Sequence, residues 1–204
     1  MISNARSARL PVAKAGAAQD AWAVKTIAPG FLISMPQLGD PNFNRAVILM
    51  LEHDDKGSMG LVVNKPAPLT LDDLAQGQGL DVLPERRAQP MFMGGPVEPQ
   101  RGFVLHDQPS LDEKHEVLPG LYLSLTLDSL RPLLMNPDAK FRFCLGYAGW
   151  GPKQLDGELA AGSWLFTEAT GGPVLELSPD KLWEATLRTM GVDPAMLLPG
   201  GGVH

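Results

Sequence analysis

The chain has 204 residues, of which 44% are hydrophobic and 20% are charged, and its formal net charge is −6. This composition is ordinary for a soluble globular protein and excludes wholesale disorder, and the length fits one domain with a sizeable core. No apolar run approaches the roughly 20 residues of a membrane helix, so we expect no membrane partner.

The charge is placed unevenly along the chain. Residues 1–20 carry Arg6, Arg9 and Lys14 against Asp20, which leaves 14 basic and 22 acidic residues, or −8, for the remainder. An acidic body of this kind would repel a phosphate backbone. We therefore expect no nucleic-acid partner.

One domain is expected, over residues 27–199. Residues 1–26 predict a disordered or loosely held tail, because residues 1–20 have no apolar pattern that could be buried. Their basic, acid-poor composition also resembles an organelle transit peptide, and this alternative stays open. The glycine-rich residues 200–204 predict a flexible C-terminal tail.

A strand predicted over residues 31–35 leads into a central hairpin. Two apolar runs, 46–51 and 59–63, flank a polar loop in which Gly57 can take the positive φ that a short hairpin needs. The runs are apolar on both faces, which predicts a central strand pair covered on two sides. Pro66 is then expected to end the pairing, because proline lacks an N–H donor.

Short helices and strands alternate irregularly in the rest of the chain. We expect helices over residues 71–76 and 127–135, capped by Thr70 and Thr126, and further helices over 153–161 and 179–190. Strands are expected over residues 90–93, 102–106, 121–126, 140–145 and 164–166. Residues 107–119 are expected to form a loop with a short strand. The irregular order favours an α+β fold over a doubly wound parallel sheet. The prediction is a single compact domain with a mixed, barrel-like β-sheet flanked by short helices.

Two glycine-rich segments are predicted turns. Gly94-Gly95 separates two strands, and residues 146–150 turn a strand sharply into the next helix. The Gly-x-x-Gly spacing predicts positive φ or close backbone approach at both Gly146 and Gly149, with a similar loss of stability when either is replaced. Each segment could also form a backbone nest for an anion. The second segment has the outline of a nucleophile elbow, but its centre is an alanine, so we expect no nucleophile there.

The candidate polar site combines residues at the ends of strands. Glu52 and His53 resemble a base and its orienting carboxylate, but neighbours on a strand point to opposite faces, so polar groups that satisfy loop backbone are the alternative. If two strand ends adjoin, His53, His106 and Glu52 would ring a small pocket. Two tryptophans, Trp150 among them, could form the floor of a binding surface or belong to the core. The full set of candidates is Glu52, His53, Asn64, Gly94, Gly95, Arg101, His106, Tyr147 and Trp150.

We predict no metal site, no cofactor and no catalytic residue. The four His and the single Cys lack the spacings that place ligands on one face. Cys144 lies in an apolar strand, which predicts an inert core thiol. A lone cysteine cannot form an internal disulfide, which is typical of a reducing, cytoplasmic compartment.

Four stretches of the chain resemble the AlgH/YqgE family of bacterial proteins. They are residues 30–54, 57–66, 93–106 and 145–165, in matching order and spacing. The resemblance implies a compact α+β domain with a barrel-like sheet in the bacterial cytoplasm. Members are often labelled transcriptional regulators, but the family has no established reaction and no recognised DNA-binding motif, so no catalytic residue is carried over. Leu51 stands where many relatives have Cys, so a thiol role there does not extend to this chain.

Three functional hypotheses follow. The leading one is a non-catalytic binding or regulatory protein that acts through an unknown protein or small-molecule partner. The second is a small-molecule or nucleotide-binding enzyme that uses His53, His106 and Gly94-Gly95. The third, a DNA-binding regulator, is opposed by the charge. Convergence of these His, Glu and Gly groups in one cleft would favour the enzyme.

Overall fold

The computed structural model of the protein describes residues 27–197, so the tails predicted over 1–26 and 200–204 lie outside the described residues. The strands are β1 (Gly30–Ser34), β2 (Val47–Asp54), β3 (Gly57–Val62), β4 (Pro66–Thr70), β5 (Pro90–Met93), β6 (Val97–His106), β7 (Lys114–Leu118), β8 (Leu121–Ser124), β9 (Phe141–Trp150) and β10 (Trp164–Thr167). The α-helices are α1 (Leu71–Gln78), α2 (Leu127–Leu134), α3 (Gln154–Ala160), α4 (Gly171–Glu176) and α5 (Pro179–Thr189).

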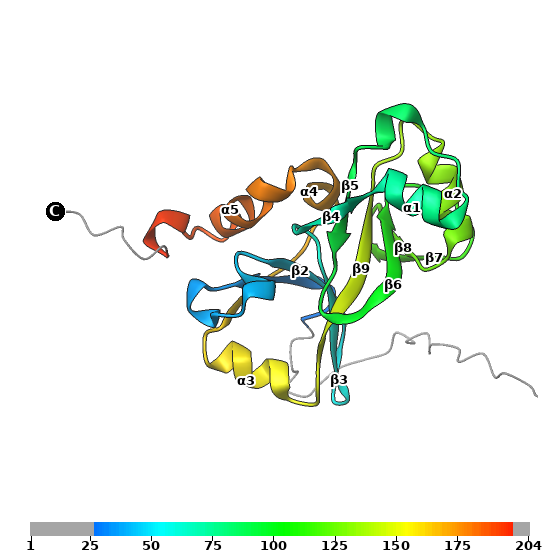
Figure 1. The fold of residues 1–204 in the computed structure, drawn as a ribbon. Coiled ribbons are helices and arrows are strands. Elements are labelled where there is room, and N and C mark those ends of the chain that lie inside the picture. The colour runs from blue at the N-terminus through cyan, green and yellow to red at the C-terminus, as the bar shows by residue number, and fades with distance from the viewer. Residues whose placement is uncertain (1–26, 198–204) are drawn as a thin grey trace, which may run out of the picture.

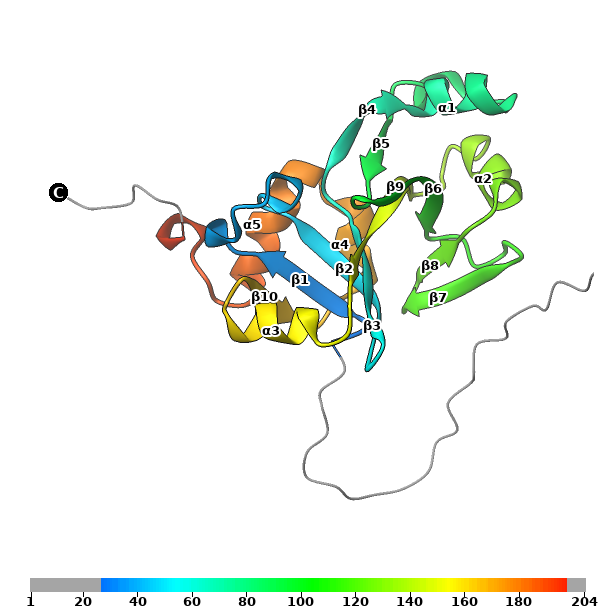
Figure 2. The ribbon, with the colours of Figure 1, turned by 60° about the horizontal axis from the view of Figure 1, so that its bottom comes forward.

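The strands form one mixed sheet in the order β10-β1-β2-β3-β9-β6-β8-β7, with β4 and β5 attached beside β9. All pairs are antiparallel except β5 with β9, which is parallel. Figure 2 shows β1, β2 and β10 on one side and β6, β7 and β8 on the other, with β3 and β9 joining the two halves. The predicted α+β fold with a mixed, barrel-like sheet and short helices is confirmed.

The sheet is curled, so that its two halves share one core. Phe31 of β1 and Leu118 of β7 belong to the same cluster of buried residues, although their strands lie near opposite ends of the strand order. Helices α4 and α5 lie side by side in Figure 1. They contribute Val174, Leu182 and Trp183 to this inner cluster. On the outer face, one cluster includes Leu155 of α3, and another is built around α1 and α2.

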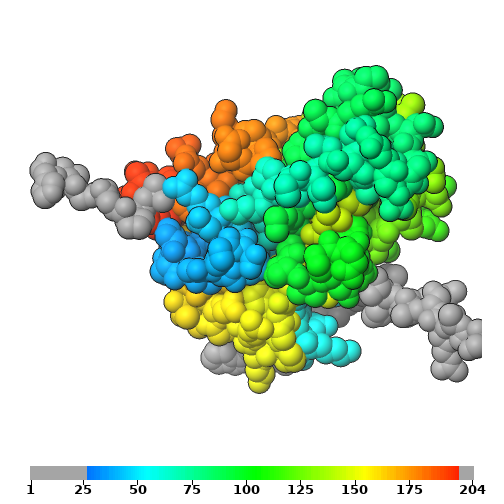
Figure 3. Space-filling model, in the orientation of Figure 1, coloured from blue at the N-terminus to red at the C-terminus, as the bar shows by residue number. Residues whose placement is uncertain are grey.

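The predicted central hairpin is confirmed. β2 pairs with β3 from Ile48↔Val62 to Asp54↔Gly57, with a bulge between Met50 and Glu52. Successive β2 residues enter different cores, because a strand alternates its side chains between faces: Leu49 lies in the inner cluster and Ile48 in the outer one. The tip of the hairpin projects from the body beside α3 in the space-filling view (Figure 3).

The predicted turn at residues 146–150 is wrong, because these residues continue β9. Gly146 has φ +69°, which bends the strand without ending it. Before the bend β9 pairs with β5 and β6, and beyond it Gly149 and Trp150 pair with Met59 and Ser58 of β3. The bend therefore transfers β9 from one half of the curled sheet to the other.

Other boundaries follow local chemistry. The Oγ1 of Thr70 accepts the Asp73 N–H at 3.3 Å, and that of Thr126 accepts the Ser129 N–H at 3.3 Å, so both predicted helix caps form. Pro66 does not end the pairing as expected; it opens β4, which pairs irregularly with β5 at the side of the sheet, where proline is tolerated. Strand β6 starts at Val97, earlier than predicted, and α4 was not predicted.

Within the described residues, no helix is long and apolar enough to cross a membrane.

Candidate functional site

At one end of the inner face of the curled sheet, the core borders a groove whose lining includes no residue of α4 or α5. Leu49, Leu61, Leu105 and Leu121 are buried in the inner cluster. Two residues further along these strands lie Leu51, Met59, Phe103 and Leu123, which belong to the same cluster or pack against it. Leu51 lies in the bulge between Met50 and Glu52. These four side chains line a groove of about 380 Å³, here called the barrel groove. Its full lining is Pro29, Leu51, Glu52, Met59, Arg101, Phe103, His115, Glu116, Val117, Leu123 and Leu125.

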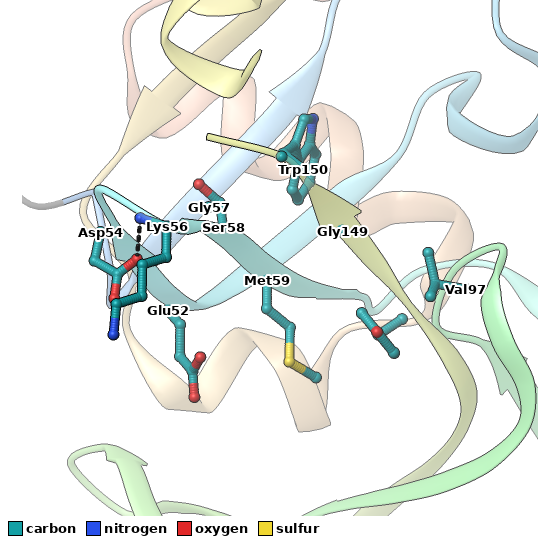
Figure 4. A pocket seen from close by; sticks show the side chains of 11 residues that line it. Glu52, Asp54, Lys56, Gly57, Ser58, Met59, Val97, Gly149 and Trp150 are labelled. Carbon is teal, nitrogen blue, oxygen red and sulfur yellow. Dashed lines mark hydrogen bonds between the residues drawn. The ribbon is translucent and has the colours of Figure 1, made fainter. Parts of the chain in front are cut away.

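A second, more polar cavity adjoins the barrel groove near the tip of the β2–β3 hairpin. This hairpin pocket has a volume of about 490 Å³ (Figure 4). Glu52 and Met59 are strand partners and line both cavities, so the two are neighbours. The remaining lining is Asp54, Lys56, Gly57, Ser58, Val97, Tyr147, Gly149, Trp150 and Gly151.

Glu52 and His53 are placed on different sides of the hairpin. Glu52 lines the barrel groove, whereas the Nδ1 of His53 lies 2.7 Å from the Ser58 Oγ and its Nε2 lies 3.5 Å from the Asp156 Oδ1 on α3. The predicted dyad is therefore absent, because strand alternation separates the two side chains. His53 instead links the hairpin to α3.

His106 is buried far along the sheet from His53. Its Nε2 lies 2.9 Å from the Ser124 Oγ, its Nδ1 accepts the Gln108 N–H at 3.2 Å, and burial lowers its pKa below the ordinary value of 6.5. His106 pairs with Phe141 at the start of β9, whereas Ser58, the strand partner of His53, pairs with Trp150 at its end. Those positions lie at opposite ends of β9, about 30 Å apart as measured along the strand. The predicted pocket of His53, His106 and Glu52 therefore does not form.

Asn64 and the two glycines are used inside the fold. The Asn64 Oδ1 accepts the Val47 N–H at 2.8 Å and its Nδ2 donates to the Arg45 carbonyl at 2.8 Å, which closes the hairpin opposite its tip. The Gly94 N–H donates to the Leu145 carbonyl at 2.8 Å, so it is not free to bind an anion. Gly95 has φ +153°, and a Cβ there would clash with the backbone of Tyr147. The predicted anion nest is thus a crossing of two strands.

Arg101, Tyr147 and Trp150 border the two cavities. The Arg101 guanidinium lies 5.1 Å from the centre of the Phe103 ring and 3.2 Å from the Glu98 carboxylate. Tyr147 lines the hairpin pocket and packs edge-on against Phe103, with ring centroids 6.1 Å apart. Trp150 is buried and donates its indole N–H to Glu158 at 3.0 Å, so it serves the core and also borders the pocket. Of the nine candidates, Glu52, Arg101, Tyr147 and Trp150 line the cavities.

Sequence reasoning missed the apolar residues that make the barrel groove. Met59 lies in a predicted apolar run, which favours a core position, and Leu125, which is 45% exposed, lies within the strand predicted over residues 121–126. The available signal was the extension of the apolar pattern by one further inner-face position on several strands. That pattern indicates a groove only when the strands are known to lie side by side in the curled sheet.

Cys144 and Arg142 are neighbours on β9 and both are buried. Burial raises the pKa of the Cys144 thiol to about 12 and lowers the pKa of Arg142 to about 10. The Arg142 guanidinium donates to the carbonyl of Val63 and to that of Leu177 at 2.6 Å, and it lies over the Phe92 ring. The thiol is a core group, which agrees with its predicted inert role.

In the part of the chain that the structure describes, no group of three or more His, Cys, Asp and Glu could hold a metal ion.

Known proteins match most of the chain. A family model described as AlgH-like matches residues 31–195. A UPF0301 protein from Myxococcus xanthus (strain DK1622) is 64% identical over 181 residues, which cover 89% of this chain and 100% of the relative. A UPF0301 protein from Anaeromyxobacter dehalogenans (strain 2CP-C) is 38% identical over 187 residues, which cover 86% of this chain and 94% of the relative.

Two solved structures share the fold. The solution structure of the AlgH protein from Pseudomonas aeruginosa has a TM-score of 0.69 and 33% identity, and the match covers 91% of this chain and 100% of that one. A crystal structure of a protein from Corynebacterium diphtheriae has a TM-score of 0.62 at 19% identity, covering 79% of this chain and 86% of that one, and it supports the fold alone. The resemblance found in the sequence is confirmed, and the chain belongs to the AlgH-like family of UPF0301 proteins.

Proposed function

We propose that the protein is a non-catalytic binding protein that recognises a partner in the barrel groove. The observation that carries the proposal is the groove that opens at one end of the inner core. Leu51, Met59 and Phe103 continue the rows of Leu49, Leu61 and Leu105, but α4 and α5 pack only over the other end of that face. An apolar groove next to a well-packed core is a common form of recognition site.

The rim of the barrel groove supplies polarity. Glu52, Arg101, His115 and Glu116 surround the apolar floor. A few polar groups around an apolar floor are the usual means by which a site orients its ligand, and a volume of about 380 Å³ lies within the range of ligand sites. The groove therefore suits a partner that buries apolar side chains and presents polar groups at the rim.

The arrangement of the histidines favours binding over catalysis. His53 is engaged by Ser58 and Asp156, and His106 by Ser124 and the Gln108 N–H. Neither lines the barrel groove, so the enzyme hypothesis loses the convergence on which it depended. The charge of −8 over residues 21–204 opposes direct contact with DNA. A regulatory protein of this kind would therefore act in the cytoplasm through a bound partner.

Site-specific photo-crosslinking tests the proposal. A photoreactive residue replaces Leu125 at the groove, and a matched control replaces Leu69 on β4; both leucines are 45% exposed, and only Leu125 lines the groove. In cells of the source organism, intact-mass analysis should find one discrete adduct, of a protein or a small molecule, at position 125. Equal labelling at the two positions, or no adduct at 125, would contradict the proposal.

A further inference from the structure

The strand β7 forms a free edge of the sheet beside the barrel groove. Among the strands of residues 27–197 it ends the strand order and pairs with β8 alone, from Lys114↔Ser124 to Leu118↔Leu121. Within the described residues, no backbone hydrogen bond joins its outer side to another segment. An edge of this kind presents a row of N–H and C=O groups that can pair with a further strand.

The edge and the groove are parts of one surface. His115, Glu116 and Val117 of β7 line the barrel groove, together with Leu123 of the adjacent β8. The other outer strand, β10, does not line it. A strand added to β7 would therefore run along the groove, and alternate side chains would point to its apolar floor.

We propose that the groove binds an extended segment of a partner protein, which adds to β7 as an extra antiparallel or parallel strand. This inference rests on the proposed function and gives the class of partner. Apolar side chains at alternate positions of the segment would contact the partly exposed Met59 and the 45% exposed Leu125, and backbone hydrogen bonds to β7 would hold its register.

The two carboxylates that line the groove favour a partner segment that carries a basic residue. Glu52 and Glu116 both line it, and neither forms an ion pair with a described residue. Arg101 also lines the groove, but its guanidinium is already paired with the Glu98 carboxylate at 3.2 Å. A Lys or Arg in the segment would complement the two carboxylates, which also discriminates against acidic partners.

Backbone methylation of a probe peptide tests strand addition directly. The probe is a fluorescently labelled peptide of about nine residues that alternates Val with Thr and Lys, a length that matches an ordinary strand. Two variants carry N-methyl groups on alternate residues, one on the odd and one on the even positions, so that each loses a different set of N–H donors. Fluorescence anisotropy measures the Kd of each peptide for the full-length chain.

Strand addition predicts an asymmetric result. One N-methylated peptide should bind at least about 10-fold more weakly than the parent peptide, because it loses two or more hydrogen bonds to β7, and the other should bind like the parent. The Leu125→Arg protein should also bind the parent peptide at least about 10-fold more weakly, while the equally exposed Leu69→Arg should not. Circular dichroism confirms that both variants fold.

Several outcomes overturn the inference, and they are distinguishable from failure of the proposed function. If the parent and both N-methylated peptides bind equally and Leu125→Arg weakens all three, the groove binds side chains alone and only strand addition fails. If no peptide binds while the photo-crosslink at position 125 still forms, the partner is of another chemical class. A dimer in sedimentation that the peptide dissociates would assign β7 to a second copy. An affinity that rises more than about 10-fold on deletion of residues 1–26 would assign the groove to the chain's own segment.

Discussion

Replacing Gly146 by alanine should destabilise the fold by about 3 kcal/mol, because this residue both bends β9 and lies against a crossing strand. Its φ of +69° costs an alanine about 1–2 kcal/mol. The added Cβ would also clash with the carbonyl oxygen of Gly95 and lie 2.8 Å from that of Val97. Both are backbone atoms, so the segment from β5 to β6 has to move away from β9.

That movement weakens the hydrogen bonds that fasten the crossing. The Gly94 N–H donates to the Leu145 carbonyl at 2.8 Å, and the Gly94 carbonyl accepts the Val62 N–H at 2.8 Å. Each bond contributes about 1 kcal/mol, so loss of one or both adds about 1–2 kcal/mol to the backbone strain. In urea, with a slope of about 2 kcal/mol per M, the midpoint should fall by about 1.5 M without a change in slope.

Gly149→Ala is the matched control on the same strand. Gly149 does not have positive φ, and its added Cβ would meet side chains only, with the ring edge of Tyr147 at 3.2 Å and the Val97 Cγ2 at 3.6 Å. The cost should stay below about 1 kcal/mol, since a side chain can yield more easily than backbone. The Gly-x-x-Gly pattern predicted equal losses, and the structure corrects this. A Gly146→Ala protein with the parent's midpoint, or equal losses at both glycines, would refute the reasoning.

Three further predictions concern the core, the buried histidine and the surface charge. Asn64→Ala should lower the free energy of unfolding by about 2–3 kcal/mol in urea titration, because the Val47 N–H and the Arg45 carbonyl lose their partners; a loss below about 0.5 kcal/mol would contradict this. Burial lowers the pKa of His106, so below about pH 6.5 the unfolded state binds more protons than the folded state, and the free energy of unfolding should fall as the pH falls. The fall should be less steep in His106→Gln. The same dependence on pH in both proteins would contradict this prediction. Duplex DNA should show no sequence-dependent mobility shift below about 1 μM at physiological salt, and such a shift would overturn the argument from charge.

Features set by neighbouring residues were predictable from the sequence. The β2–β3 hairpin follows from two apolar runs around a polar loop, and the helix caps at Thr70 and Thr126 follow from residues within one turn. The separation of Glu52 from His53 also follows from strand alternation alone.

Features set by distant pairing were not predictable in this way. A glycine-rich segment is compatible with a turn or with a bent strand, and the pairing of Trp150 with Ser58 decides for the strand. The barrel groove combines residues from β2, β3, β6, β7 and β8, which meet only because the sheet curls. The composition of Gly94-Gly95 suggested an anion nest, but the neighbouring strand already uses the Gly94 N–H.

The most direct test of partner binding in the barrel groove is methyl NMR of the nine methionines. Met59 lines the groove, and Met93, which is 48% exposed on β5, is a control outside it. On titration with the partner identified by the cross-link at position 125, the Met59 methyl signal should shift or broaden while the Met93 signal stays in place. Saturable binding that leaves Met59 unchanged, or that moves Met93 instead, would contradict the account.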